Sequence, residues 1–155
     1  MEKQIEIIKS TRQALLQFVS DLTVEQLNEI PAGFNNNIIW NLAHLMSSQQ
    51  GLCYVRSGLP LFVEEKYFES YKPGTKPENV VNSEEIAAIK FLFLSTIEQF
   101  QQDYANGAFA NYTLFTNRYG VNIASIEDAI TFVNFHEGIH FGYIMALKRV
   151  VSRKS

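Results

Sequence analysis

The sequence predicts an all-α fold, a four-helix bundle in a single domain over residues 1–155, and three observations support this prediction. Apolar residues recur at three- and four-residue intervals in four long stretches, the spacing of one helix face. Capping residues precede the last three stretches, and turn-forming residues separate all four. With 155 residues, of which 46% are hydrophobic and 19% charged, the chain is large enough to bury one core.

The first helix is expected over roughly residues 2 to 21. Its apolar stripe is formed by Ile5, Ile8, Leu15, Val19 and Leu22. Thr23 then begins a short turn of helix, because Gln26 is placed to complete a capping box and Pro31 to end it.

The second helix is expected over roughly residues 37 to 56. The run Asn35-Asn36-Asn37 supplies its cap, and Ser57-Gly58 with Pro60 ends it. A long crossover over residues 58–82 then leads to the third helix. Its aromatic residues argue against a disordered linker, and they are Phe62, Tyr67, Phe68 and Tyr71. A connection this long often acts as a lid or a partner surface.

The third helix is expected over roughly residues 83 to 104, because Asn82-Ser83-Glu84-Glu85 is a capping-box start and Asn106-Gly107 a stop. Residues 107–124 are either a second ordered loop or a short hairpin, and the sequence leaves both open. The last helix begins at Ser125 and carries acids in its first turn and cations in its last. Its apolar stripe is formed by Ile126, Ile130, Val133, Ile144, Leu147 and Val151.

Composition excludes several classes of protein. A net charge of −3 and a pI near 5.6 argue against a nucleic-acid-binding surface. The lone Cys53 excludes an internal disulfide and favours a reducing compartment. The charged start of the chain is unlike a signal peptide, and no apolar run is long enough to span a membrane. We therefore expect a cytoplasmic protein.

All three histidines lie where they could share one metal ion. His136 and His140 are four residues apart on one helix face, and steps of three and four from Val133 reach both before Ile144. His44 lies in the middle of the second helix. One histidine on an apolar face is usually a satisfied core residue, but three on two core-facing stripes favour a site inside the bundle. Three neutral imidazoles with open positions suit zinc, nickel or iron.

The segment from His136 to His140 also matches H-E-x-x-H, in which Glu137 would be the general base of a zinc peptidase. The 15 residues after His140 contain no histidine or acid that could be a third ligand. Tyr143 and Ala146 stand where the extended motif needs glycine and histidine. A peptidase is therefore disfavoured, and we expect Glu137 to be a surface or interhelical acid.

Two motifs carry a family resemblance: Asn-Asn-Ile-Ile-Trp-Asn-Leu-Ala-His over residues 36–44, and His-Glu-Gly-Ile-His-Phe-Gly-Tyr-Ile over residues 136–144. Together they resemble the DinB-like superfamily, which includes bacillithiol transferases and is related to mycothiol-dependent enzymes. The resemblance implies an up-up-down-down bundle, often homodimeric, with a divalent metal on three histidines. By motif these ligands are His44, His136 and His140. Gly142 matches the small residue after the second histidine, where close helix packing is its ordinary role.

The leading hypothesis is therefore a metal-dependent enzyme for a small-molecule substrate, of thiol S-transferase or hydrolase type and with a low-molecular-weight thiol as a possible co-substrate. The alternative is a non-catalytic stress-related or regulatory metal-binding dimer, although three protein ligands argue against a purely structural zinc site. DNA binding, which the family's damage-inducible name suggests, conflicts with the acidic balance.

Further residues could assist the site, although packing is the ordinary role of each. Asn41, Ser48 and Glu137 could orient ligands or move protons. Four loop tyrosines could form the wall of a pocket, and they are Tyr67, Tyr71, Tyr112 and Tyr119.

Overall fold

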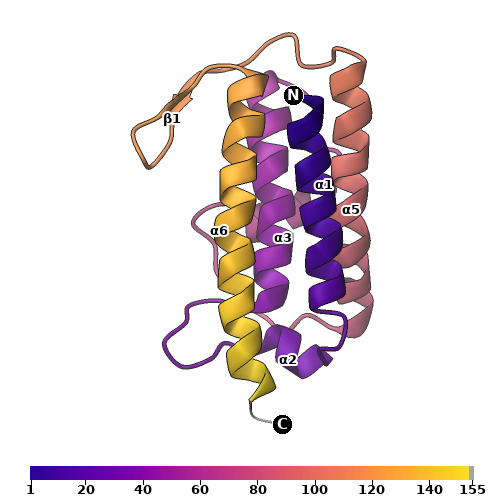
Figure 1. Ribbon diagram of the computed structural model, residues 1–155, viewed down its shortest axis with the longest axis vertical. Coiled ribbons are helices and arrows are strands. Elements are labelled where there is room, and N and C mark those ends of the chain that lie inside the picture. The colour runs from indigo at the N-terminus through magenta and orange to yellow at the C-terminus, as the bar shows by residue number, and fades with distance from the viewer. Residues whose placement is uncertain (154–155) are drawn as a thin grey trace.

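The structure, a computed structural model, describes residues 1–153 and confirms the predicted all-α fold. Residues 154 and 155 of the predicted domain lie outside the described residues. Four long helices lie side by side, and we call them the bundle (Figure 1). They are α1 (Glu2–Phe18), α3 (Ile38–Gln49), α5 (Ser83–Ala105) and α6 (Ile126–Ser152).

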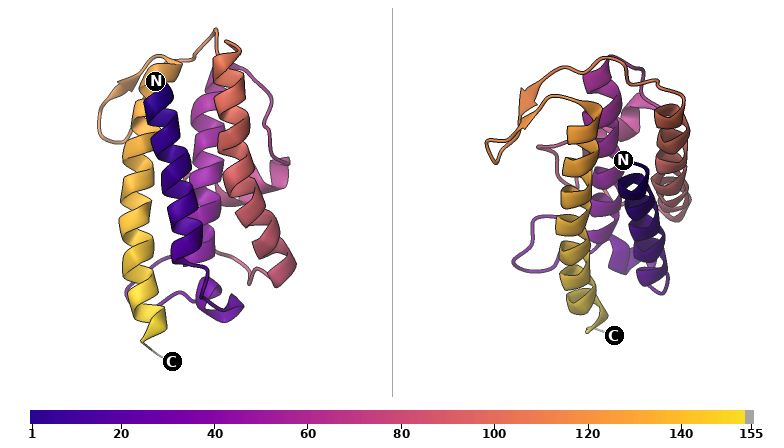
Figure 2. Two further views of the ribbon diagram at one scale, coloured as in Figure 1. Left: turned by 45° about the vertical axis from the view of Figure 1, so that its right-hand side comes forward. Right: turned by 45° about the horizontal axis from the view of Figure 1, so that its top comes forward.

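The helices α1 and α6 run in one direction, and α3 and α5 run in the other (Figures 1 and 2). The contacts agree: Arg12 bonds to Glu137 and Lys148 to the Phe18 carbonyl, so α1 and α6 advance together. The order is therefore up-down-down-up, which corrects the up-up-down-down order that the resemblance implies. The reason is the segment 19–37, which folds its helix α2 (Val24–Asn28) beneath one end of the bundle, so that α3 returns antiparallel to α1.

Side-chain caps begin the elements where the sequence predicts them. Thr23 and Gln26 form the expected capping box at α2. At α3, α5 and α6 the cap side chain accepts a hydrogen bond from the backbone N–H three residues later in the chain. These caps are Asn37, Asn82 and Ser125. Each cap satisfies an N–H group that lacks a partner within its helix.

The second predicted helix does not continue as an α-helix to residue 56. After Gln49 it widens into a π-helical turn, Gln50–Tyr54, and then tightens into a 3-10 turn, Val55–Ser57. Gly51 lies in the π turn, and a Cβ there would come 3.3 Å from the Phe68 ring. The π turn rotates the residues that follow it away from the regular helical register, a distortion often found at functional sites.

The crossover 58–82 is ordered by aromatic packing, as its composition indicates, but it also holds an unpredicted helix, α4 (Glu65–Tyr71). Tyr67 and Tyr71 of α4 are buried in the same apolar cluster as α3 residues. This segment therefore packs against the bundle along α3.

Residues 107–124 contain a hairpin, which decides between the two alternatives left open by the sequence. Its strands β1 (Phe115–Thr116) and β2 (Asn122–Ile123) pair antiparallel, and they lie beside the first turns of α6 (Figure 2). The Asn117 side chain accepts the backbone N–H groups of Tyr119 and Val121. Gly120 has φ +78°, a left-handed conformation that glycine adopts without strain.

A polar layer crosses the core between two apolar clusters. Arg12 and Glu137 form this layer with Thr96, and no more than 2% of any of these residues is exposed. On α6, Glu137 lies four residues after Val133 and is the buried residue of the stripe at this level. His136 and His140 flank it and are only partly buried. Within residues 1–153, no helix combines the length and apolarity needed to cross a membrane.

Candidate metal centre

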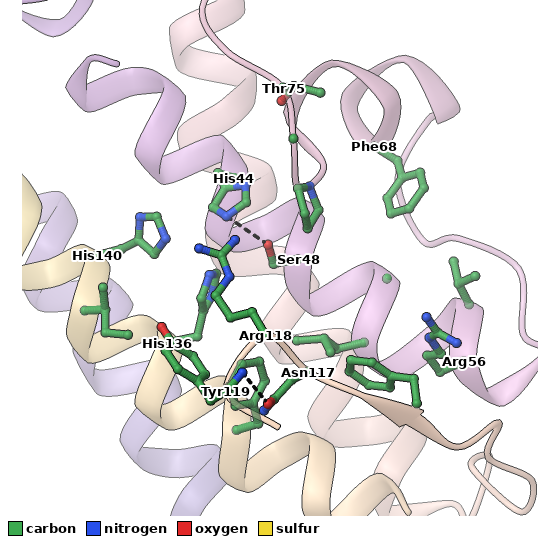
Figure 3. A pocket seen from close by; sticks show the side chains of 18 of the residues that line it. His44, Ser48, Arg56, Phe68, Thr75, Asn117, Arg118, Tyr119, His136 and His140 are labelled. Atoms are coloured by element: carbon green, nitrogen blue, oxygen red, sulfur yellow. Dashed lines mark hydrogen bonds between the residues drawn. The ribbon is translucent and has the colours of Figure 1, made fainter. Parts of the chain in front are cut away.

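The structure brings His44 of α3 together with His136 and His140 of α6. One ring nitrogen of each lies within 4.8 Å of the others. The ring centroids are 4.5 to 5.2 Å apart, and the three imidazoles face one another (Figure 3). His44 is buried, and the two α6 histidines are partly buried.

The backbone of α4 fixes the orientation of the His44 ring. Its Nδ1 lies 2.7 Å from the Tyr71 carbonyl oxygen. A carbonyl only accepts hydrogen bonds, so Nδ1 carries the proton and Nε2 keeps its lone pair. Trp40, one turn earlier on α3, stacks on the His44 ring at a centroid distance of 4.5 Å. Nε2 is thereby directed toward the α6 histidines, where it could bind a metal.

Asn41 orients His140 in the same way. Its amide nitrogen donates to the Asn37 carbonyl and the Asn36 side-chain oxygen, so its own oxygen must face the other way. That oxygen lies 2.7 Å from Nδ1 of His140 and accepts a hydrogen bond from it. Hydrogen bonds of this kind fix the tautomer and aim of histidine ligands in metal sites.

Burial keeps all three imidazoles neutral. It is the largest cause that lowers the pKa of each, to about 3 for His136 and about 4 for His140. The neighbouring histidines and the positive charge of Arg118 add to the effect on the α6 pair. A neutral imidazole is the form that binds metal, so no proton has to be displaced near neutral pH.

The donor set therefore fits a divalent ion. Bonds of about 2.0 to 2.1 Å from zinc to nitrogen place two ligand nitrogens roughly 3 to 3.5 Å apart. The observed limit of 4.8 Å requires only small rotations of the rings to reach that spacing. Three nitrogens leave at least one further position on the ion for water or substrate.

The three histidines line a cavity of about 770 Å³, within the usual size of small-molecule sites. The hairpin, the middle of the crossover (residues 68–75) and the π turn line it together with α3 and α6. Ser48 is on its wall, with Oγ 3.3 Å from Nε2 of His44 (Figure 3). Its hydroxyl therefore lies beside the His44 nitrogen that faces the α6 histidines.

Glu137 does not line this cavity, so the structure gives it no place as a general base. Its carboxylate turns toward α1 and accepts two hydrogen bonds from Arg12, at 2.7 and 2.9 Å. Burial raises the pKa of Glu137, and the Arg12 guanidinium opposes that effect. The expectation of an interhelical acid is thus correct and that of a surface acid is not. The sequence contained a signal for the partner of Glu137, because Arg12 interrupts the apolar stripe of the first helix between Ile8 and Leu15.

Of the four loop tyrosines, Tyr119 alone has a place on the cavity wall. Tyr67 and Tyr71 fill the core, and the Tyr112 hydroxyl donates to the Leu52 carbonyl. Gly142 is exposed, and a Cβ there would meet nothing within 4 Å, so close packing within the chain does not explain it.

The cavity wall also contains two arginines that the sequence did not indicate, Arg56 and Arg118. Arg118 is at the tip of the hairpin, and its side chain extends toward the histidines (Figure 3). Asn117 and Gly120 are turn-forming residues and indicate a turn at this position. Nothing in the sequence indicates that the turn lies beside α6.

The family model described as the DinB superfamily matches residues 7–144, a range that includes all three histidines and most of the chain. A comparison with curated proteins gives no match. With its helical fold and its histidine cluster, the chain belongs to the DinB superfamily.

Proposed function

We propose that this protein is a metal-dependent enzyme that binds one divalent ion, zinc, nickel or iron, through His44, His136 and His140. The supporting observation is the convergence of three neutral imidazoles on one wall of a cavity large enough for a small molecule. A structural zinc site is normally closed by a fourth protein ligand. Among the described residues, the cluster contains no cysteine or carboxylate that would close it.

Within this proposal, thiol S-transfer is favoured over hydrolysis. A bound divalent ion lowers the pKa of a thiol or water ligand and so supplies a nucleophile at neutral pH. The described residues that line the cavity include no carboxylate that could serve as general base for water. In S-transfer a sulfur–carbon bond forms, the bond from carbon to the leaving group breaks, and the thiol proton passes to solvent.

The thiol would come from a low-molecular-weight co-substrate rather than from the chain. Cys53 is fully buried in the apolar core, and burial raises its pKa. It is also absent from the cavity wall. Ser48, beside His44, could hold or pass the proton, while Trp40 and Phe132 exclude water on two sides of the histidines.

The competing function is a non-catalytic, regulatory metal-binding dimer, and one surface supports the dimer part of it. The outer face of α6 exposes Phe135, Ile139 and Met145, with 54%, 41% and 38% of each accessible. Exposed apolar patches of this kind mark association surfaces. We propose that two copies of the chain associate through this face, whether or not the protein is catalytic.

Metal analysis of the purified protein tests the site. We expect about one divalent ion per chain and its loss in His140→Ala. The control is Asn134→Ala on the same helix, whose amide bonds to the Gln4 carbonyl on α1 and not to the cluster. Full retention of metal in His140→Ala contradicts the site, and equal loss in the control shows that the effect is not specific.

Turnover then separates the two functions. The metal-loaded protein is assayed with a panel of low-molecular-weight thiols and a chromogenic aryl halide. We expect consumption of thiol above the uncatalysed rate, and none in His140→Ala. A protein that binds metal but consumes no thiol in this assay supports the regulatory alternative.

A further inference from the structure

We propose that the cavity binds an anionic small molecule, whose carboxylate or phosphate group is held by Arg118 beside the three histidines. The assignment of this anion as the substrate rests on the proposed function. The binding site itself rests on the charges and contacts of the cavity wall.

The wall carries positive charge without a compensating acid. Arg56 and Arg118 line it, and none of its described lining residues is an aspartate or glutamate. This contrasts with the whole chain, which has 16 acidic and 13 basic residues. A cleft that carries charge of one sign attracts ligands of the other sign.

Arg118 has no partner within the part of the chain that the structure describes. Among residues 1–153, no ion pair or hydrogen bond involves its guanidinium, whereas Lys9, Lys72 and Lys148 each pair with a carboxylate. The guanidinium is close enough to the histidines for its charge to lower the pKa of all three. It therefore faces the centre with its five N–H donors unused, in the planar geometry that matches carboxylate and phosphate oxygens.

The backbone holds Arg118 at this position. The Asn117 side chain accepts two N–H groups across the turn, and its backbone N–H donates to the Val121 carbonyl. Gly120 supplies the left-handed residue that closes the turn. The side chain thus extends from a preformed turn, which reduces the entropy lost on binding.

Arg56 defines the other end of the wall. Its guanidinium lies 4.4 Å over the Phe115 ring, which holds it without neutralising it. The wall that carries the two arginines also has an apolar part, formed by Gly51, Leu52, Val55, Phe68 and Phe115. The chemistry of the wall fits a ligand with an acidic group at Arg118 (Figure 3) and an apolar body that contacts the apolar part of the wall.

Trp40 allows a direct binding test, because it is the single tryptophan of the chain and lines the cavity. Its fluorescence is titrated with four probes of similar size: benzoate, phenyl phosphate, neutral benzamide and cationic benzylamine. The proteins are the wild type, Arg118→Gln, and the control Arg149→Gln, which removes the same charge from an exposed position on α6. Each is titrated as purified and again after chelation and dialysis, with metal content measured.

We expect benzoate or phenyl phosphate to bind at least about tenfold more tightly than benzamide, because a charged hydrogen-bond pair contributes about that factor or more. The two anions distinguish a carboxylate site from a phosphate site. Arg118→Gln should remove the preference and Arg149→Gln should keep it. The preference should also survive removal of the metal.

Equal binding of benzamide and the anions overturns the inference. An anion preference that Arg118→Gln leaves intact also overturns it, as does absence of anion binding at millimolar concentration. A metal-loaded protein with any of these three results keeps the proposed function and loses this site. A protein without metal that still shows a preference dependent on Arg118 keeps the site and loses the proposed function.

Discussion

The buried pair of Arg12 and Glu137 offers the sharpest test of how the bundle is held together. Arg12→Met removes the guanidinium and retains much of its apolar volume. The substitution eliminates two hydrogen bonds to Glu137, and three more to the Phe93 carbonyl, the Thr96 hydroxyl and the Leu45 carbonyl. Glu137 is then left buried beside His136 with no cation to balance its charge.

The magnitude follows from this complete burial. Arg12 and Glu137 are 0% and 2% exposed, so water cannot replace the lost partner. Removal of one member of such a pair costs about 3 to 5 kcal/mol, against a total stability of about 5 to 15 kcal/mol for a typical domain. The double variant with Glu137→Leu removes both charges and should be more stable than Arg12→Met alone.

Urea unfolding followed by circular dichroism measures these differences. The matched control is Lys9→Met, which breaks a half-exposed pair between the same helix and Glu98 of α5. We expect that control to cost less than about 1 kcal/mol, because solvent screens the pair. The reasoning is refuted if Arg12→Met costs no more than Lys9→Met, or if the double variant is the least stable of the set.

Three further predictions follow from other contacts. Asn41→Ala should weaken metal binding by about 10- to 100-fold in a chelator competition, because it frees the His140 ring that Asn41 orients; unchanged affinity would contradict this role. The Lys148 hydrogen bond lowers the pKa of Asp21 below 3.8, so its stabilisation exists above that pH and is lost as the pH falls. Calorimetry should therefore show that Asp21→Asn lowers Tm at neutral pH but not in strong acid, and an equal loss at both would exclude the pair. Phe135→Glu should convert a dimer into a monomer by light scattering, and a monomeric wild type would rule out the proposed α6 interface.

The element boundaries were predictable because local chemistry sets them. Asn37, Asn82 and Ser125 cap their helices through contacts three residues away, which the sequence displays directly. The π turn after Gln49 was not predicted, and the close approach of Phe68 to Gly51 within it joins segments that are distant in sequence. The predicted up-up-down-down order of the helices was also wrong, because the direction of α3 depends on where the α2 segment packs.

The grouping of the histidines was predictable from helical periodicity, but the roles of their neighbours were not. By helical spacing alone, either His136 or Glu137 could follow Val133 as the next buried residue of the stripe. His136 is three residues after Val133, and Glu137 is four. Arg12, a residue far away in the chain, decides between them by pairing with Glu137.

The sequence by itself determined an all-α protein with three histidines on two helices that share a core, because helical spacing and caps are local properties of the chain. The tertiary structure alone decided what surrounds them. The Tyr71 carbonyl that orients His44, the burial of Glu137 and the position of Arg118 over the cavity all join segments remote in sequence. Such contacts depend on how the crossover and the hairpin pack against the bundle, and packing is a property of the whole fold.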